Sequence, residues 1–204
     1  MAHFTVLVLL PLNTENFEQK VKDLLYPYYS ELEVEPYRQY LDRIAVEEEV
    51  KQLLLLSEED LARLALDWEV PSKNLEAIAK LRLDWDEEEV MGNDEHGAYR
   101  FSTINPYGKW DSYTLLDGEL TETGKITHYP CRARELPEVI PYAVITPDGK
   151  WYEVSKDIGI QAFARTHLHH DMPISEEEII WNLKVKAIIT QYQDHFVMGL
   201  NCHL

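Results

Sequence analysis

The chain has 204 residues, 45% of them hydrophobic, with five tryptophans and twelve tyrosines, so it can bury a sizeable core and is excluded from the disordered class. Its net charge is −18, and residues 1–95 hold 23 of the 37 acidic side chains but only 9 of the 19 basic ones. Such a surface disfavours non-specific nucleic-acid binding, which relies on Lys and Arg neutralising phosphates. We therefore expect no direct nucleic-acid partner, and the acidic half is either a solvated face or a face that mimics DNA or docks a partner.

The N-terminal residues carry no secretory pattern, and the chain has only two cysteines, Cys131 and Cys202. Both observations favour a reducing, cytoplasmic compartment. The apolar residues 4–12 are far fewer than the roughly 20 that a membrane-spanning helix requires. We therefore expect no membrane association, and we expect residues 1–204 to form a single domain.

Residues 3–10 are rich in Val, Leu and Thr and end at Pro11, which predicts a buried, central strand. An apolar stripe at helical spacing follows from Phe17 to Leu25, with Asn13 or Thr14 as its expected N-cap. Residues 28–40 contain many aromatic side chains without a clear period. We interpret them as a loop with short extended pieces.

The period becomes helical over residues 45–83, which predicts a small helical insertion. Ser57 with Asp60 three residues later resembles a capping box, and Pro71 is expected to open the last helix. Residues 84–89 read as a boundary loop, and residues 92–94 read as a turn.

Antiparallel strands are predicted over the middle of the chain. Residues 98–104 and 109–116 are expected to form a hairpin around the turn residues 105–108, and residues 142–146 and 150–154 to form a second one around Pro-Asp-Gly. Ser175 is expected to cap a helix, and residues 195–204 alternate as a last strand that pairs with the first. The predicted fold is α+β, a mostly antiparallel sheet backed by two longer helices.

One candidate binding site lies in the first predicted hairpin. If residues 109–113 form a strand, Lys109, Asp111 and Tyr113 share one face, where a cation, a carboxylate and a phenol could bind a polar ligand. The alternative is a solvent-facing Lys109–Asp111 ion pair with Trp110 in the core. The following side chains complete the candidate ligand-binding set: Arg100, Asn105, Tyr107, Lys109, Trp110, Asp111 and Tyr113.

A second candidate is the segment around His167, His169 and Asp171, whose donors suit zinc. His203 is the further ligand that such a site could recruit, and a metal-bound water would then be the nucleophile of a hydrolase. The alternative is an exposed loop that binds no metal, and no cofactor is expected. Cys202 and His203 are adjacent on a strand and point to opposite faces, so they are not expected to form a catalytic pair.

Several of these segments together resemble an uncharacterised family found in bacteriophage and bacterial genomes. The resemblance lies in Asn105-Pro106-x-x-Lys109-Trp110-Asp111-x-Tyr113, the Thr146–Trp151 hairpin and a C-terminal strand that contains histidine. Similar proteins continue into a Gly-Gly-Arg-Trp-like turn where this chain has residues 114–118, which implies a reduced or altered ligand site. The resemblance implies a cytoplasmic location in a bacterial host, and it carries no established activity.

Three hypotheses follow. The first is a non-enzymatic binding protein, a phage or prophage accessory with an anti-defence role, that captures a small anionic ligand such as a nucleotide signal, or a host protein. The second is a metal-dependent hydrolase built on His167, His169 and Asp171. The third is an acidic nucleic-acid mimic, and a homo-oligomer is compatible with all three.

Overall fold

The computed structural model describes residues 3–116, 119–120, 126–137, 140–154 and 175–203. The chain divides into two compact units. The first, the sheet unit, consists of Met1–Glu33 and Ile104–Leu204, and the second, the inserted unit, is Val34–Thr103. Among the described residues, no helix combines the length and the apolar character that crossing a membrane demands.

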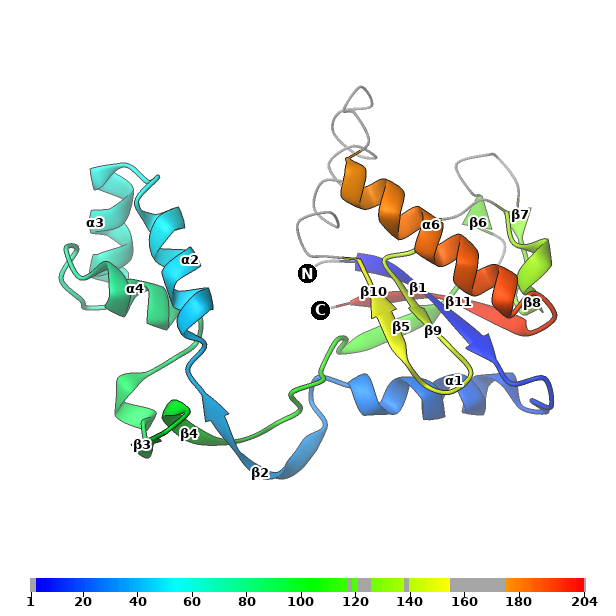
Figure 1. Ribbon diagram of the computed structural model, residues 1–204, viewed down its shortest axis with the longest axis horizontal. Helices are drawn as coiled ribbons and strands as arrows, with labels where there is room; N and C mark the ends of the chain where they lie inside the picture. Colours follow the sequence, from blue (N-terminus) through cyan, green and yellow to red (C-terminus); the bar gives the residue numbers. More distant parts are fainter. Residues whose placement is uncertain (1–2, 117–118, 121–125, 138–139, 155–174, 204) are drawn as a thin grey trace. The chain divides into compact units, whose positions relative to one another are not determined.

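The sheet unit is built on a mixed, mostly antiparallel sheet with the strand order β10-β9-β1-β11-β5, and β8 also pairs with β11 (Figure 1). β1 is antiparallel to β11, with His3 opposite His203 and Leu10 opposite Phe196, and β1 is parallel to β9. The elements of this unit are β1 (His3–Leu10), α1 (Phe17–Leu25), β5 (Ser112–Leu115), β6 (Glu119–Leu120), β7 (Ile126–Thr127), β8 (Cys131–Arg132), β9 (Ala143–Ile145), β10 (Trp151–Glu153), α6 (Glu176–Gln191) and β11 (Phe196–His203).

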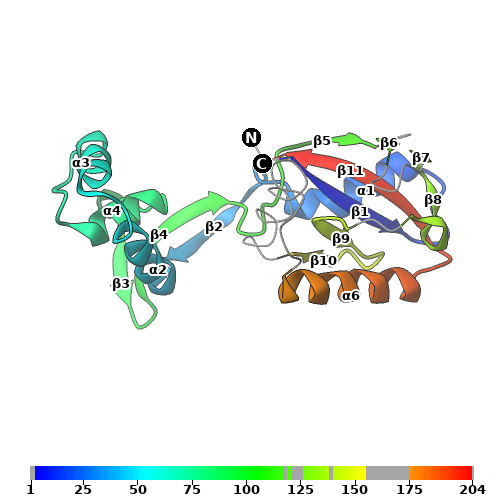
Figure 2. The same cartoon turned by 90° about the horizontal axis from the view of Figure 1, so that it is seen from above.

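Helices cover both faces of this sheet (Figure 2). Val6, Val8 and Leu10 of β1 belong to the cluster that contains Val21, Leu24 and Leu25 of α1. The alternate residues Leu7 and Leu9 belong to the cluster that contains Trp181, Val185 and Ile188 of α6. A strand with apolar residues at every position is what a sheet buried on both faces requires.

The sequence correctly predicts this frame. The α+β class, the central first strand, its pairing with the last strand and the second hairpin, β9 with β10, are all confirmed. Ser175 caps α6 by accepting a hydrogen bond from the backbone of Glu178. The cap of α1 is Asn16 rather than Asn13 or Thr14, because its side chain accepts from the Gln19 amide.

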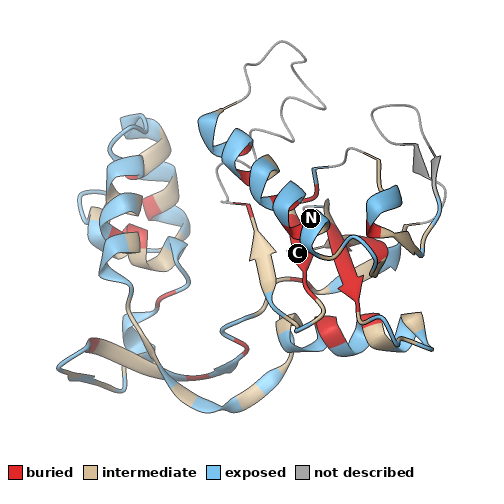
Figure 3. Ribbon diagram, turned by 45° about the vertical axis from the view of Figure 1, so that its right-hand side comes forward, coloured by how far each residue is buried: buried red, intermediate tan, exposed pale blue. Residues whose placement is uncertain are grey.

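The inserted unit combines three helices with a small sheet of order β2-β4-β3. Its core consists of Val46, Leu53, Ala65, Ile78 and Ala79, and Figure 3 shows how much of its helical surface is exposed. Ser57 caps α3 and accepts from the Asp60 amide, as predicted. Its elements are β2 (Glu33–Tyr40), α2 (Arg43–Leu53), α3 (Glu58–Asp67), α4 (Leu75–Arg82), a 3-10 turn (Glu87–Glu89), β3 (Gly92–Asp94) and β4 (Gly97–Ile104).

The helical insertion predicted at residues 45–83 is confirmed, since α2, α3 and α4 lie between residues 43 and 82. Four other predictions fail in and around this unit. Residues 33–40 form the edge strand β2 rather than a loop, and residues 92–94 form β3 rather than a turn. No residue of β2 is buried, so no apolar alternation marks it as a strand. The hairpin of residues 98–104 with 109–116 is wrong, since β4 pairs with β2 and β3 while β5 pairs with β11. Asn74, not Pro71, begins α4 as its N-cap.

Candidate functional site

The side chain of Asn105 holds two segments of the sheet unit together through hydrogen bonds. Its side chain is buried, and its Nδ2 donates hydrogen bonds to the carbonyl oxygens of Pro27 (2.8 Å) and Tyr29 (2.9 Å). Its Oδ1 accepts from the backbone amide of Tyr107, whose own side chain is 68% exposed. The amide of Asn105 therefore joins the turn after β4 to the segment that follows α1.

Trp110 and Tyr113 lie on the same side of the sheet, which corrects the predicted alternation. Trp110 is buried in the cluster beneath α1, and its Nε1 donates to the Leu25 carbonyl oxygen at 3.2 Å. Tyr113 packs against the same cluster, with its ring centroid 5.3 Å from that of Trp110. The alternation fails because the strand begins only at Ser112, and Asp111 is a bend before it.

Lys109 does not pair with Asp111. Its Nζ lies 2.7 Å from Oε1 of Glu153 on β10, and the other oxygen of Glu153 accepts from Nε1 of Trp151 at 2.8 Å. The Asp111 carboxylate instead accepts from the hydroxyl of Ser112 at 2.9 Å. The predicted core position of Trp110 is correct, whereas the predicted ion pair is wrong because β10 brings a nearer carboxylate.

Arg100 belongs to the inserted unit, apart from the other six candidates. Its side chain is 12% exposed, its Nε donates to Gln39 at 2.9 Å, and its guanidinium also pairs with Glu89. The guanidinium stacks over the ring of Trp85 at 5.2 Å. The structure therefore engages Arg100 in contacts within its own unit.

His167, His169 and Asp171 lie outside the described residues. His203 is described, and its ring centroid lies 4.0 Å from that of His3 on the neighbouring strand. Over the part of the chain that the structure describes, no group of three His, Cys, Asp or Glu side chains is arranged to hold a metal ion.

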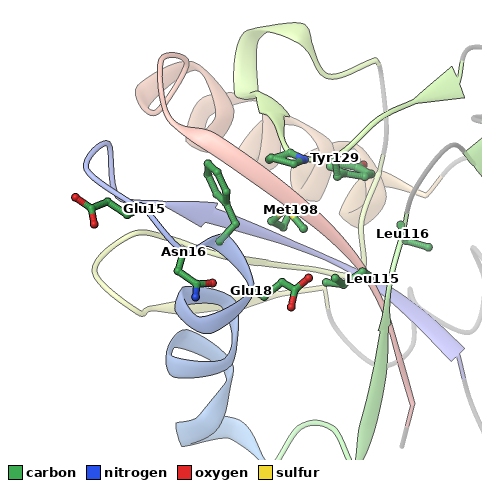
Figure 4. A pocket seen from close by; sticks show the side chains of 9 residues that line it. Glu15, Asn16, Glu18, Leu115, Leu116, Tyr129 and Met198 are labelled. Carbon is green, nitrogen blue, oxygen red and sulfur yellow. The ribbon is translucent and has the colours of Figure 1, made fainter.

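A pocket of about 470 Å³ lies in the described part of the sheet unit, and the sequence did not predict it (Figure 4). Met198 of β11 and Leu115 of β5 contribute apolar atoms, and the ring of Tyr129 lies across from α1. Its complete lining is Glu15, Asn16, Phe17, Glu18, Leu115, Leu116, Tyr129, Pro130 and Met198. These residues come from four separate stretches of the sequence, so no local motif identifies them as one site.

The wall formed by Tyr129 is fixed by a glycine. A Cβ at Gly199 would lie 2.6 Å from the Tyr129 ring, closer than real Cβ atoms approach other groups. The absence of a side chain at Gly199 thus lets the Tyr129 ring lie directly on β11. Phe17, another lining residue, packs edge-on against Phe196, with 5.1 Å between the ring centroids.

The charge at this pocket is negative. Glu15 and Glu18 are exposed and line its rim, and none of the nine lining residues is basic. The pKa of the nearby Tyr113 hydroxyl is raised first by burial and then by the Cys202 thiol and the Glu18 carboxylate. The pocket therefore combines an apolar floor with an acidic rim.

The two thiols are poor nucleophiles at neutral pH. Burial raises the pKa of Cys202 to about 12, and burial with the nearby Glu135 raises that of Cys131 to about 11. Cysteine chemistry needs the thiolate, so both side chains act as packing groups, as predicted for Cys202.

No family model matches this chain, and no curated protein and no solved structure matches it.

Proposed function

We propose that this protein is a non-enzymatic binding protein whose pocket beside α1 takes a small amphipathic cation. The observation that carries the proposal is the pocket itself, about 470 Å³ of space with an apolar floor at Met198 and Leu115 and carboxylates at its rim. Ligand sites in proteins are concave and mostly apolar, with a few polar groups that set orientation. An aromatic or alkyl body against the floor and an ammonium group beside Glu18 satisfy both parts of this lining.

The charge of the ligand follows from comparing the positive end of the α1 helix dipole with the negative charge of the nearby carboxylates. The N-terminus of α1 faces the pocket and carries the equivalent of roughly half a positive charge. Glu18, in the first turn of the helix, carries a full negative charge and points toward Leu115, whereas the Glu15 carboxylate points away from the other lining side chains (Figure 4). The net field therefore favours a cation over an anion, more strongly at low ionic strength.

An anionic ligand, such as a nucleotide signal, remains a separate prediction for the residues around Lys109. An anion there would compete with Glu153 for the Lys109 ammonium group. The accessory role in a phage or prophage, directed against a host defence, is carried by the sequence resemblance alone and is part of this proposal on that basis.

A thermal-shift screen with three arms separates these ligands. One arm uses aromatic and alkyl amines, one uses the matched carboxylates, and one uses cyclic and linear nucleotides. A ligand at a hundred times its Kd adds about 2.7 kcal/mol to the free energy of unfolding, so a true ligand raises Tm by several degrees. We expect the rise in the amine arm.

Two variants test whether the ligand binds at this pocket. Glu18→Gln keeps the shape of the rim and removes one charge, so it should reduce the shift with amines. Glu177→Gln, an exposed charge on α6, is the matched control and should leave the shift unchanged. A rise with carboxylates or nucleotides but not with amines contradicts the cation pocket, and equal shifts in both variants contradict its location.

A further inference from the structure

The inserted unit carries an apolar groove along α3, lined by Ala62, Ala65, Leu66, Glu69, Val70 and Ser72 and holding about 350 Å³. We call it the α3 groove. Leu66 is 78% exposed at its edge. Ala62 and Leu66 are one helical turn apart and so share a face of α3. Leu66 lies in the last turn of α3, and exposing so much of a leucine side chain to water is unfavourable.

The groove ends at an unusual helix terminus. Val70 donates its amide to the Ala65 carbonyl (2.9 Å) and Glu69 donates to that of Leu66 (3.2 Å), the paired bonds of a Schellman motif. Glu69 stands at the position where this motif favours glycine, and its φ is 56°. A side chain is thus held in a left-handed conformation at the lip of the groove, and its carboxylate is exposed.

Acidic side chains mark both ends of this face. Glu58 and Glu59 are exposed in the first turn of α3, and Asp67 and Glu69 are exposed at its end. The helix between these two ends, α3, is about 15 Å long at 1.5 Å per residue. Arg63, the basic residue of α3, already pairs with Asp60 at 2.9 Å. The face therefore presents an apolar centre between two negative ends.

We propose that the α3 groove docks an amphipathic helix with a basic polar face from a partner protein. The apolar stripe of that helix lies against Ala62, Leu66 and Val70. Its Lys or Arg side chains, about three turns apart, meet the two acidic ends of α3. Helices bind grooves through apolar anchors at i, i+3 or i+4 and i+7, and charge complementarity sets their register and orientation.

The charge of the whole unit supports this partner. Val34–Thr103 carries 18 acidic and 8 basic residues, a net charge of −10 in 70 residues. A second copy of the same unit would bring like charges together, and anionic lipids would be repelled. A basic amphipathic helix would gain binding free energy both from contact with the apolar surface and from attraction to the negative charge of the unit.

The test uses the full-length chain and a defined probe, a fluorescein-labelled 14-residue peptide of Leu and Lys in helical amphipathic order, followed by fluorescence anisotropy. Leu66→Asp makes the surface more negative while removing the apolar anchor. Docking predicts at least tenfold weaker binding for this variant, whereas charge attraction alone predicts tighter binding. Leu183→Asp, at a 62% exposed leucine on α6, is the control and should bind like the wild type.

A second pair of variants separates binding from folding. Glu69→Gly should raise Tm by about 2 °C because the left-handed position suits glycine, and should weaken peptide binding severalfold. Asp84→Gly is the matched control, since Asp84 also has a positive φ, 55°. The same motif is formed there, because the amide of Asp84 donates to the Leu81 carbonyl oxygen and the amide of Trp85 donates to that of Lys80. This control should raise Tm equally and leave binding unchanged.

Three outcomes would overturn the proposal. One is undiminished peptide binding to Leu66→Asp. The second is equal binding of a peptide in which Ser replaces every Leu. The third is a dimer in light scattering that Leu66→Asp dissociates, which would assign the groove to a second copy of the chain.

Discussion

The sheet unit and the inserted unit bury their apolar side chains in different ways. In the sheet unit, Val6 to Leu10 of β1 are at most 1% exposed, because α1 and α6 cover both faces of the strand. In the inserted unit, five buried residues form the core, and Leu54, Leu55 and Leu66 are each more than 60% exposed. The two units also differ in charge, since the smaller one holds nearly half of the acidic residues.

This difference in burial predicts different stabilities for the two units and suits them to different kinds of site. Regions with few buried apolar contacts open at lower free energy than the main core. The sheet unit can hold a pocket, because its apolar wall at Met198 stands on β11, a strand that is buried along most of its length. The inserted unit offers an exposed apolar surface rather than a deep pocket, and the docking proposal rests on that surface.

The largest predicted effect tests this difference in stability. Leu9→Ala should lower the free energy of unfolding of the sheet unit by about 2–5 kcal/mol, because Leu9 is fully buried against the α6 cluster. Ile78→Ala should destabilise the inserted unit and leave amide protection in β1 and β11 unchanged. Native-state hydrogen exchange measures both. Equal loss of protection in both units for either variant would show that the chain opens as one cooperative body.

The next effect concerns Asn105, which links the turn after β4 to the segment after α1. Asn105→Ala should cost about 1–3 kcal/mol, because the carbonyl oxygens of Pro27 and Tyr29 lose their donors. Urea unfolding measures it against Asn93→Ala, an exposed residue of β3, which should change stability by less than about 0.5 kcal/mol. If the two variants unfold at the same urea concentration, the hydrogen bonds of Asn105 do not hold these two segments together.

A smaller effect appears at alkaline pH. The folded-state pKa of Cys202 is raised to about 12 from a reference of 9.0. The unfolded thiol therefore loses its proton first, and stability falls as pH rises from about 9 towards 12, by about 1 kcal/mol over the first unit. Well below pH 9 the thiol is protonated in both the folded and the unfolded state, so it makes stability independent of pH there. Cys202→Ala should unfold in urea with a shallower alkaline decline than wild type, and an identical decline would contradict burial of a protonated thiol.

The smallest effect is that of the Lys109–Glu153 ion pair. Both side chains are about one-third exposed, and such pairs contribute about 0.2–1 kcal/mol. Lys109→Met should lower stability by that amount at low salt and by less at 1 M salt. Lys51→Met, at an exposed position, serves as the control for loss of a positive charge. A loss above 2 kcal/mol would mean that Lys109 holds the sheet edge together.

The sequence predicts the frame of the fold because its signals are local. The continuous apolar run of β1, the Ser175 cap of α6 and the alternation in β11 each lie within one short stretch. The partners of β4 and β5 do not follow from such signals. The turn at residues 105–108 was expected to pair these two strands, yet tertiary packing assigns them to different sheets.

The candidate site is less predictable for the same reason. Asn105 has the chemistry of a turn residue, but its partners Pro27 and Tyr29 lie more than 70 positions away. The pocket depends on Glu18, Leu115, Tyr129 and Met198, which approach one another only in the folded chain. Lys109 illustrates the opposite error, since its neighbour in sequence, Asp111, is not its partner in space.

The most direct test of the pocket is isothermal titration of the full-length protein with tryptamine and with indole-3-propionate at low ionic strength. The two compounds share one ring system and differ in the sign of their charge. We predict saturable binding of tryptamine that weakens severalfold in Glu18→Gln, and at least tenfold weaker binding of the carboxylate. Tighter binding of indole-3-propionate, or tryptamine binding that Glu18→Gln leaves unchanged, would contradict the assignment of a cation site beside α1.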